Sequence, residues 1–338
     1  MTTRRQLIQA AAAAVLSVSA RGFVRAQTGT PDRLLTIPGP GRVRVALDTD
    51  TFNELDDQYA LAYSLLSPER MAVEAIYAAP FVNDRSRSAA EGMEKSYEEI
   101  QRLLNFFPHV DRRIALRGSG RFFGRKNRPV DSPAARDLIE RALNPGDGPL
   151  YVLTIGCPVN VSSAILMEPK IKEKIVVVWL GGTPSYWPSA NEFNLQQDVI
   201  ASQVLFDSGV PLVQVPTKNV SEHLRTTVPE LDRHLRGRSR IGDYLYGQFL
   251  QYFAERLKQG QGQDFPWSKV IWDISAVAWL KNPEWVPSQI VPSPVLTDDM
   301  HWQSATGRHN IRVANSVDRD AIFNDVFSRL SRLDDQAR

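Results

Sequence analysis

A cluster of five carboxylates between an apolar strand and an amphipathic helix constrains this chain more than any other feature. Residues 43–47 form an apolar run typical of a strand, and apolar side chains recur at helical spacing over 55–66. Between them stand Asp48, Asp50, Glu54, Asp56 and Asp57. The junction of a strand end and a helix start is where α/β proteins bind ligands. Because neighbouring carboxylates repel one another, the pattern predicts a bound hard cation with oxygen ligands, either Ca²⁺ or Mg²⁺.

Helix capping explains only part of this cluster. Aspartate is a favoured N-cap residue and suits the first helical turn, near the positive end of the helix dipole. Capping accounts for one or two of Glu54, Asp56 and Asp57, but not for Asp48 and Asp50, which precede the helix. A metal or catalytic site is therefore the favoured interpretation.

The rest of the chain alternates between apolar strands and helices. Further strands are predicted at 71–79, 113–116, 150–155, 175–180 and 211–215. Helices are predicted at 89–105, 132–143, 159–167, 199–206, 244–258, 271–280 and 320–330. This alternation is typical of an α/β fold with a mainly parallel central sheet flanked by helices, here with a more helical C-terminal half. Polar loops after the strands then share one edge of the sheet, where a site is expected.

The N-terminal segment has the composition of an export signal. Arg4 and Arg5 precede a short apolar run at 10–20, and Ala26 offers a small residue for cleavage. The run is too short to span a bilayer comfortably, so we expect no stable membrane insertion once the signal is removed. The expected organisation is a twin-arginine-type signal at 1–26, a Pro/Gly-rich lead at 27–41 and a single domain at 42–332, in a protein exported to the periplasm or the exterior.

Charge and cysteine content narrow the classes of function. The chain has a formal net charge of +2, and removal of residues 1–26, which hold four arginines and no acidic residue, brings it to −2. A nearly neutral protein has no electrostatic footprint for nucleic acid. The single cysteine, Cys157, excludes an intrachain disulfide. A small buried thiol is favoured over a nucleophile at Cys157, because no histidine lies nearby in the sequence.

Segments along nearly the whole mature chain, in the expected order, resemble the inosine–uridine-preferring nucleoside hydrolase family. The family's first strand ends in Asp-x-Asp, followed by Pro-Gly-x and by Asp-Asp at a helix start; the corresponding stretch here is 48–57, with a longer middle. The resemblance continues at Asn83, at 154–160 (similar to the family's Thr-Gly-x-Leu-Thr-Asn), at 180–182, at 191–194 and at Asp273. It implies a Rossmann-like fold and hydrolysis of the N-glycosidic bond of ribonucleosides or related ribosides, which releases ribose and a base.

The resemblance also implies a set of site residues. A Ca²⁺ ion would be held by Asp50, Asp57, Asp273 and the main-chain carbonyl of Thr154, and Asp50 would also act as general base for the attacking water. Asp48 is expected to support the turn instead of binding the metal. The ribose hydroxyls would be bound by Asp56, Asn83, Glu192 and Asn194. Two aromatic side chains are added as substrate contacts, Trp272 and Trp187.

One departure from the family concerns the leaving group. Purine-accepting members carry a histidine, the leaving-group acid, immediately before the aspartate at the position of Asp273, and this chain has Trp272 there. Indole cannot protonate a base at neutral pH, although it can stack on one. His223 could reach the site on a loop, but a solvated surface histidine is favoured. The family's nucleobase preference therefore cannot be carried over to this chain.

Two alternatives stay open. An exported protein that binds ribosides or sugars through the metal site, with little or no turnover, is compatible with Trp272, whereas Asp50 as a base argues for an enzyme. A haloacid-dehalogenase-like phosphatase also begins with Asp-x-Asp after an apolar strand, but Phe52 stands where that class has Thr or Val, and the class gives Asp56 and Asp57 no role. The expected partner is a small molecule, a nucleoside or riboside. A homo-oligomer (dimer or tetramer) is compatible with the sequence.

Overall fold

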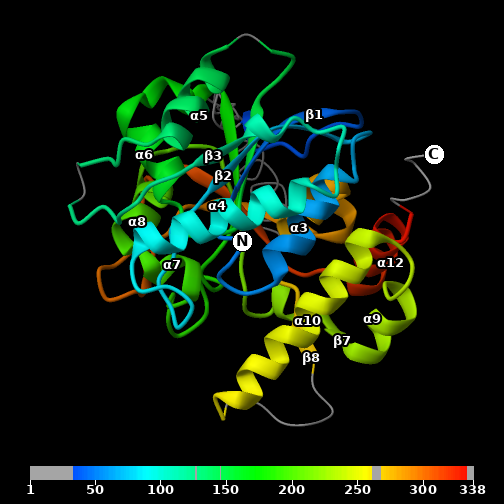
Figure 1. The fold of residues 1–338 in the computed structure, drawn as a ribbon. Coiled ribbons are helices and arrows are strands. Elements are labelled where there is room, and N and C mark those ends of the chain that lie inside the picture. Colours follow the sequence, from blue (N-terminus) through cyan, green and yellow to red (C-terminus); the bar gives the residue numbers. More distant parts are fainter. Residues whose placement is uncertain (1–32, 126–127, 145, 261–267, 333–338) are drawn as a thin grey trace, which may run out of the picture.

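An eight-stranded sheet forms the centre of the protein (Figure 1). The computed structural model describes residues 33–125, 128–144, 146–260 and 268–332, so the expected signal at 1–26 lies outside the described residues. In spatial order the strands are β3 (Ala115–Arg117), β2 (Met71–Ala78), β1 (Val43–Thr49), β4 (Leu150–Thr154), β5 (Ile175–Leu180), β6 (Leu212–Val215), β12 (Asn310–Ala314) and β9 (Ser288–Pro292). Neighbouring strands are parallel except β12 and β9, which are antiparallel.

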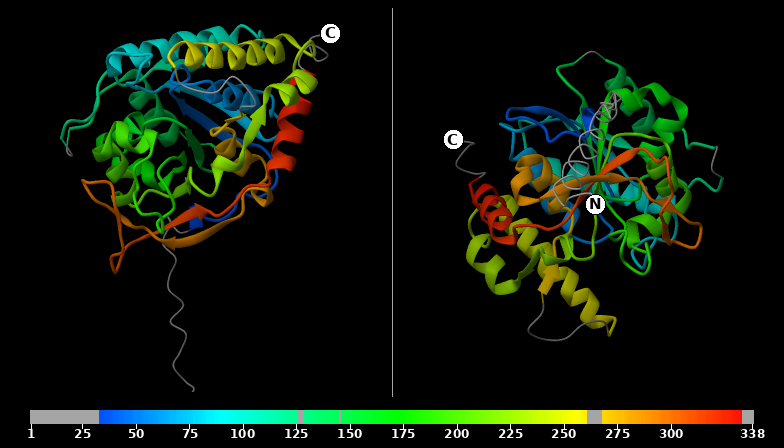
Figure 2. Two further views of the ribbon diagram at one scale, coloured as in Figure 1. Left: turned by 90° about the horizontal axis from the view of Figure 1, so that it is seen from below. Right: turned by 180° about the vertical axis from the view of Figure 1, so that it is seen from behind.

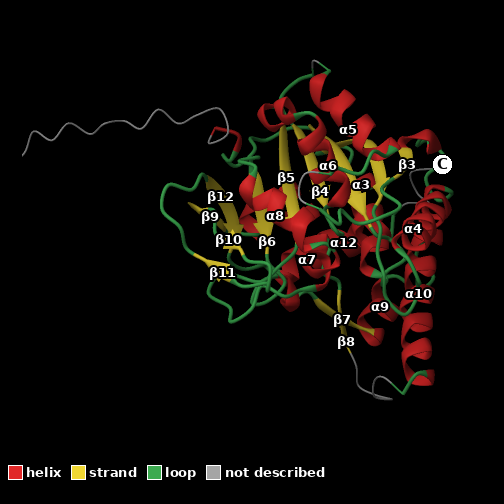
Figure 3. Cartoon of the chain, turned by 90° about the vertical axis from the view of Figure 1, so that its left-hand side faces the viewer, coloured by secondary structure: helices red, strands yellow, loops and turns green. Residues whose placement is uncertain are grey.

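Helices cover both faces of this sheet (Figure 3). One face packs against α3 (Asp56–Leu65), α4 (Ala89–Leu104), α10 (Arg240–Lys258), α11 (Ile274–Lys281) and α12 (Arg319–Leu330). The other packs against α5 (Pro133–Leu143), α6 (Val159–Met167) and α8 (Val199–Asp207). Because successive strand residues point to opposite faces, Val45 and Leu47 join the first core and Ala46 joins the second. The predicted α/β fold with a mainly parallel sheet is confirmed.

The longest helix, α10, lies at the periphery of the molecule, where Figure 2 shows it in yellow. It is tied to α4 by a hydrogen bond from the Tyr244 hydroxyl to Glu99 and by packing of the Tyr244 ring on Phe106, with ring centroids 5.1 Å apart. Across the described ranges, no helix combines the length and the apolar composition needed to cross a membrane.

Several elements differ from the sequence-based prediction. Two small antiparallel pairs lie outside the main sheet, β7 (Arg225–Thr227) with β8 (Ser268–Val270) and β10 (Val295–Leu296) with β11 (Trp302–Gln303). The helix α9 (Val228–His234) and the strand β12 were not predicted, and the predicted loop at 184–197 ends in a short helix, α7 (Phe193–Gln197). In β12 the buried side chain of Arg312 interrupts the apolar pattern. Its guanidinium is satisfied by the carbonyl oxygens of Leu35 and Ser288, which explains why a charged residue is tolerated there.

Leu153 lies in the middle of β4, a central strand, and its side chain is fully buried. We expect Leu153→Ala to lower the free energy of unfolding by about 2–5 kcal/mol, because the lost apolar contacts leave a cavity in the first core. Urea denaturation followed by circular dichroism measures this loss. Leu143→Ala serves as the control, since Leu143 is 44% exposed at the end of α5 and its removal should change the free energy by about 0.5 kcal/mol or less. Equal effects of the two substitutions would contradict the assignment of β4 to the core.

Candidate active site

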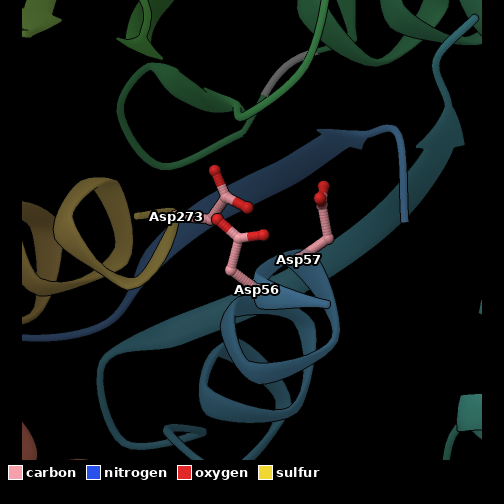
Figure 4. Close-up of side chains that lie close together, drawn as sticks. All are labelled: Asp56, Asp57 and Asp273. Carbon is pink, nitrogen blue, oxygen red and sulfur yellow. The ribbon is translucent and has the colours of Figure 1, made fainter. Parts of the chain in front are cut away.

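Four aspartates from distant parts of the chain converge at the carboxyl edge of the sheet. Asp50 follows β1 directly, Asp56 and Asp57 begin α3, and Asp273 precedes α11. The carboxylate oxygens of Asp56, Asp57 and Asp273 lie within 4.8 Å of one another, and Figure 4 shows the three side chains side by side. No member of the group of four is more than 4% exposed. The sheet therefore gathers these carboxylates into one buried acidic cluster.

The charges of this cluster are not balanced by the protein groups around Asp50. Both carboxylate oxygens of Asp50 are buried without a hydrogen-bond partner. Burial, together with the neighbouring Asp57 and Asp56 carboxylates, raises the pKa of Asp50 well above its ordinary value. Burial and Asp56 likewise raise the pKa of Asp57 to about 7. A buried, unpaired carboxylate is costly unless it coordinates a cation. The all-oxygen donor set fits a hard divalent ion, so the cluster is suited to hold a metal.

Helix capping does not account for the cluster. Leu55 occupies the N-cap position of α3, and Asp56 and Asp57 lie one and two residues further along. Asp273 occupies the N-cap position of α11, but its side chain makes no capping hydrogen bond. The contacts that do form hold the carboxylates in place: the Thr49 hydroxyl donates to Asp57, and the backbone N–H of Trp272 donates to Asp56 at 3.2 Å. The capping alternative is thus excluded for Asp273.

The turn after β4 approaches Asp50 closely. A Cβ on Gly156 would lie 3.0 Å from the Asp50 carboxyl carbon, so a side chain at this position would crowd Asp50. The residue before it, Ile155, lines the cavity described below, and its carbonyl oxygen accepts a hydrogen bond from the Asn194 side chain at 3.2 Å. Thr154 does not line the cavity. Because Ile155 lines the cavity, its carbonyl is a second candidate beside the expected carbonyl of Thr154 for a main-chain oxygen ligand.

A cavity of about 360 Å³ opens beside the acidic cluster. It brings together eight of the ten site residues expected from the sequence: Asp50, Asp56, Asp57, Asn83, Glu192, Asn194, Trp272 and Asp273. Trp187 does not line it and is 36% exposed on the loop after β5, so its contact with substrate stays a prediction. Asp48 is fully buried outside the cavity and accepts a hydrogen bond from Asn160 at 2.9 Å, which fits its expected supporting role.

Hydrogen bonds to neighbouring groups hold three polar side chains that line the cavity. Glu192 caps α7, and its carboxylate accepts hydrogen bonds from the N–H groups of Gly182, Asn194 and Leu195. Burial raises the pKa of Glu192 to about 7, although these three donors oppose the shift. The Asn194 amide donates to the carbonyls of Ile155 and Leu180. The Asn83 amide donates to the Asn53 side chain at 2.7 Å. These contacts fix the orientation of each polar group toward the cavity.

The loop between Asp50 and Asp56 adds a charged group that the sequence did not assign to the site. Glu54 lines the cavity and forms an ion pair with Lys269 of β8. The Tyr252 hydroxyl of α10 donates to its other carboxylate oxygen at 2.9 Å, and the Arg256 guanidinium lies 3.8 Å from that oxygen. Although burial opposes it, Lys269 and these neighbours hold the pKa of Glu54 below its usual value. Glu54 is therefore a fixed negative charge at the cavity wall.

Within the described ranges, no histidine lines the cavity. His223 is exposed and lies outside it, as expected for a surface histidine. Cys157 is fully buried, and burial raises the pKa of its thiol well above the ordinary value, which fits the inert thiol predicted from the sequence. The side chain at the position of the family's acid is Trp272, half-buried at the cavity wall.

The geometry agrees with the comparison to known proteins. Residues 45–324 match the family described as inosine-uridine preferring nucleoside hydrolase, which covers most of the chain. The chain belongs to this family. As a nucleoside hydrolase it acts on N-glycosyl bonds, and the resemblance expected from the sequence is confirmed.

Relatives differ in the substrates that their names state. The chain is 25% identical over 257 residues to the pyrimidine-specific ribonucleoside hydrolase RihA of Salmonella paratyphi A, covering 68% of this chain and 77% of that protein. RihA of Escherichia coli O1:K1 is 25% identical over 268 residues, covering 71% and 80%. Among solved structures, the plant nucleoside hydrolase PpNRh1 has a TM-score of 0.66 at 20% identity, covering 87% of this chain and 99% of that one. The purine-preferring ribonucleoside hydrolase of Gardnerella vaginalis has a TM-score of 0.65 at 19% identity, covering 86% and 99%. The nucleoside hydrolase fold is shared by all of these.

Protonation of the acidic cluster predicts an unusual pH dependence of stability in the metal-free protein. The pKa of Asp57 is raised from its usual 3.8 to about 7, so the native state binds more protons than the unfolded state between these values. Stability that is present at low pH is therefore lost as the pH rises through about 7. We expect Asp57→Asn, measured in a chelator, to melt at the same temperature as the wild type near pH 4 and at a higher temperature near pH 8.

Thermal unfolding of both proteins across this pH range, with and without added Ca²⁺, tests the prediction. Added metal should stabilise the wild type more than Asp57→Asn, because the substitution removes an anionic ligand. Parallel melting curves at all pH values, or equal stabilisation by metal, would contradict the role of Asp57 in the cluster.

Proposed function

We propose that this nucleoside hydrolase cleaves the N-glycosidic bond of ribosides with Asp50 as general base and Ca²⁺ as its metal. The observation that carries the proposal is the Asp50 carboxylate, buried with both oxygens unpaired at the wall of a ligand-sized cavity. A carboxylate with two unpaired oxygens can bind a cation through one oxygen and accept a proton from water through the other. A protein that only binds sugars has no need of such a base.

The metal would be held by Asp50, Asp57, Asp273 and a main-chain carbonyl, that of Thr154 or Ile155. Carboxylate and carbonyl oxygens are the ligands that Ca²⁺ takes, and the flexible coordination number of Ca²⁺ suits a site in which Asp56 also lies close. When bound, a divalent cation would neutralise the cluster, orient the attacking water and lower its pKa.

The remaining steps fall to side chains of this chain. Asp50 accepts the proton of the water that attacks the anomeric carbon. Asp56, Asn83 and Asn194 bind the ribose hydroxyls, and Glu192 accepts a further hydroxyl hydrogen bond. As the C–N bond lengthens, the sugar acquires oxocarbenium character, which the surrounding carboxylates stabilise electrostatically. The backbone contacts of Glu192 and Asn194 keep these groups oriented without reorganisation in the transition state.

The composition of residues 1–26 supports export by a twin-arginine route, and we include this location in the proposal. A protein that carries no disulfide can fold before transport, which such a route requires. Cell fractionation of the full chain, compared with a variant in which Arg4 and Arg5 are both replaced by Lys, distinguishes export from retention.

Replacement of the base should abolish turnover. We expect Asp50→Asn to lower kcat/KM for p-nitrophenyl riboside by about 10²–10⁴-fold, the usual range for loss of general base catalysis, in a reducing-sugar assay with Ca²⁺. Asp84→Asn is the matched control, because Asp84 also lines the cavity but has no assigned part in the chemistry. Asp50→Asn with wild-type activity would overturn the proposed mechanism.

Introduction of a histidine at position 272 should allow protonation of neutral leaving groups. We expect Trp272→His to raise kcat/KM for inosine relative to p-nitrophenyl riboside by about tenfold or more, because an imidazolium can donate a proton that indole cannot. Trp272→Phe keeps an aromatic ring without a proton donor and should leave this ratio unchanged or lower it. An equal response to both substitutions would show that the site handles neutral bases by another route.

A further inference from the structure

We propose that this site selects ribosides whose leaving group is a cationic nitrogen heteroaromatic, of which a ribosyl pyridinium is the simplest, and that Glu54 and Trp272 recognise it. The inference deepens the proposed function and rests on it, since it names the substrate class of the same cavity. It follows from three observations: the proton donors at the cavity, its charge, and the fixed position of Glu54.

The cavity offers no evident proton donor to a neutral leaving base. The described residues that line it include no histidine, cysteine or tyrosine. The Lys218 ammonium is directed toward Glu222, 3.5 Å away, and the Arg256 guanidinium does not release a proton in proteins. Both carboxylate oxygens of Glu192 already accept backbone N–H groups, and in the proposed mechanism this side chain also binds a ribose hydroxyl, so it is assigned to the sugar and not to the leaving base. A neutral nucleobase would therefore have to leave as an anion.

A cationic leaving group removes this difficulty. In a ribosyl pyridinium the ring nitrogen already carries the positive charge, so no proton is needed on the departing group. The water oxygen forms a bond to the anomeric carbon, the C–N bond breaks, and its electron pair passes to the ring nitrogen, which becomes neutral. The proton of the water goes to Asp50 and then to solvent. Riboside cation and water thus give ribose, a neutral pyridine and a proton.

The charge of the cavity favours a cation. Seven of the lining residues are carboxylic acids and two, Lys218 and Arg256, are cations. Lys218 lies next to Glu222, whereas Glu54 lies next to two cations, Arg256 and Lys269, of which Lys269 does not line the cavity but adds a third positive charge beside it. A divalent metal in the acidic cluster still leaves more negative than positive charges around the cavity. Such a cleft with low-dielectric walls raises the local concentration of a cationic substrate.

Glu54 and Trp272 supply the recognition groups on this side of the cavity. The Glu54 carboxylate is held by Lys269, by the Tyr252 hydroxyl at 2.9 Å and by Arg256, so it cannot turn away from the wall that it lines. The Trp272 backbone is fixed by its hydrogen bond to Asp56, and its indole lines the same cavity. Indole is the best aromatic partner for a cation. A flat cationic ring can stack on Trp272 while its charge is attracted by Glu54.

Relative kcat/KM values for five substrates test the inference in the wild-type protein with Ca²⁺. Nicotinamide riboside supplies the cation, and nicotinic acid riboside has the same cationic ring with a carboxylate in place of the carboxamide. Inosine and uridine supply the neutral bases, and p-nitrophenyl riboside is a neutral substrate that also needs no acid. We expect nicotinamide riboside to exceed both neutral nucleosides by about a hundredfold or more, the range that an absent general acid accounts for. We expect nicotinic acid riboside to react more slowly than nicotinamide riboside, since Glu54 repels its carboxylate.

Two variants separate charge recognition from fold effects. Glu54→Gln should lower the ratio of kcat/KM for nicotinamide riboside over p-nitrophenyl riboside by about tenfold, because the fixed charge is lost while the shape is kept. Glu74→Gln is the matched control: it removes another ion-paired carboxylate, the partner of Arg44, which does not line the cavity. Its ratio should equal that of the wild type. A ratio unaffected by Glu54→Gln would overturn the role of Glu54.

A spectroscopic signature tests Trp272 without turnover. Stacking of a pyridinium on indole produces a charge-transfer absorption band, so the N-methylnicotinamide cation added to the protein should give such a band, and neutral nicotinamide should not. Trp272→Leu should abolish it. A band that persists in Trp272→Leu, or none in the wild type, would overturn the stacking role.

The outcomes also separate this inference from the proposed function. Release of ribose from p-nitrophenyl riboside, with nicotinamide riboside no faster than inosine or uridine, would overturn the inference and leave riboside hydrolysis intact. No release from any of these substrates would overturn the proposed function itself.

Discussion

Mutual repulsion among four buried aspartates is the constraint on which the rest of the structure depends. Asp50, Asp56, Asp57 and Asp273 are removed from water, and the two oxygens of Asp50 have no partner in the protein. Carboxylates in such surroundings either take up protons or hold a cation. The parallel sheet makes the arrangement possible, because the carboxyl ends of β1 and β4 meet at one edge and α3 and α11 begin there. The fold thus stores an electrostatic cost that a bound metal relieves.

Features that depend on local sequence patterns were predicted, whereas features that depend on contacts between distant residues were not. Apolar periodicity is a local signal, and it predicts the parallel sheet, most helices and the position of the cluster at 48–57 between a strand and a helix. Eight of the ten expected site residues line the cavity. Strand β12 escaped prediction because Arg312 breaks its apolar pattern. The guanidinium is satisfied by Leu35 and Ser288, which are not its neighbours in the sequence. Helix α7 escaped because a five-residue helix capped by Glu192 has too little periodicity to stand out in a polar loop. Trp187 was predicted to contact substrate only because it lies in the loop after β5, and the position of a residue in a loop does not determine the direction of its side chain.

The longer loop between Asp50 and Asp56 shows the same limit at the site. Glu54 was visible as one of five carboxylates, but its role depends on Lys269 and Tyr252, which lie about two hundred residues away in sequence and meet it only in the folded protein. An ion pair between β8 and this loop has no sequence signature. The main-chain ligand shows the same limit, because sequence spacing alone does not show that Ile155 lines the cavity and Thr154 does not.

The backbone and the side chain of Trp272 have separate tasks. Its backbone N–H donates to Asp56, and the next residue, Asp273, belongs to the acidic cluster, so the main chain here serves the metal site whatever side chain it carries. The side chain lines the cavity, where the proposed leaving group would depart. Indole at this position supplies no acid in the proposed mechanism, so departure must depend on the substrate's own leaving group, while the main-chain contact to the cluster is kept. A leaving group that carries its own positive charge meets that requirement, and the fixed carboxylate of Glu54 gives the charge a counterpart in the protein.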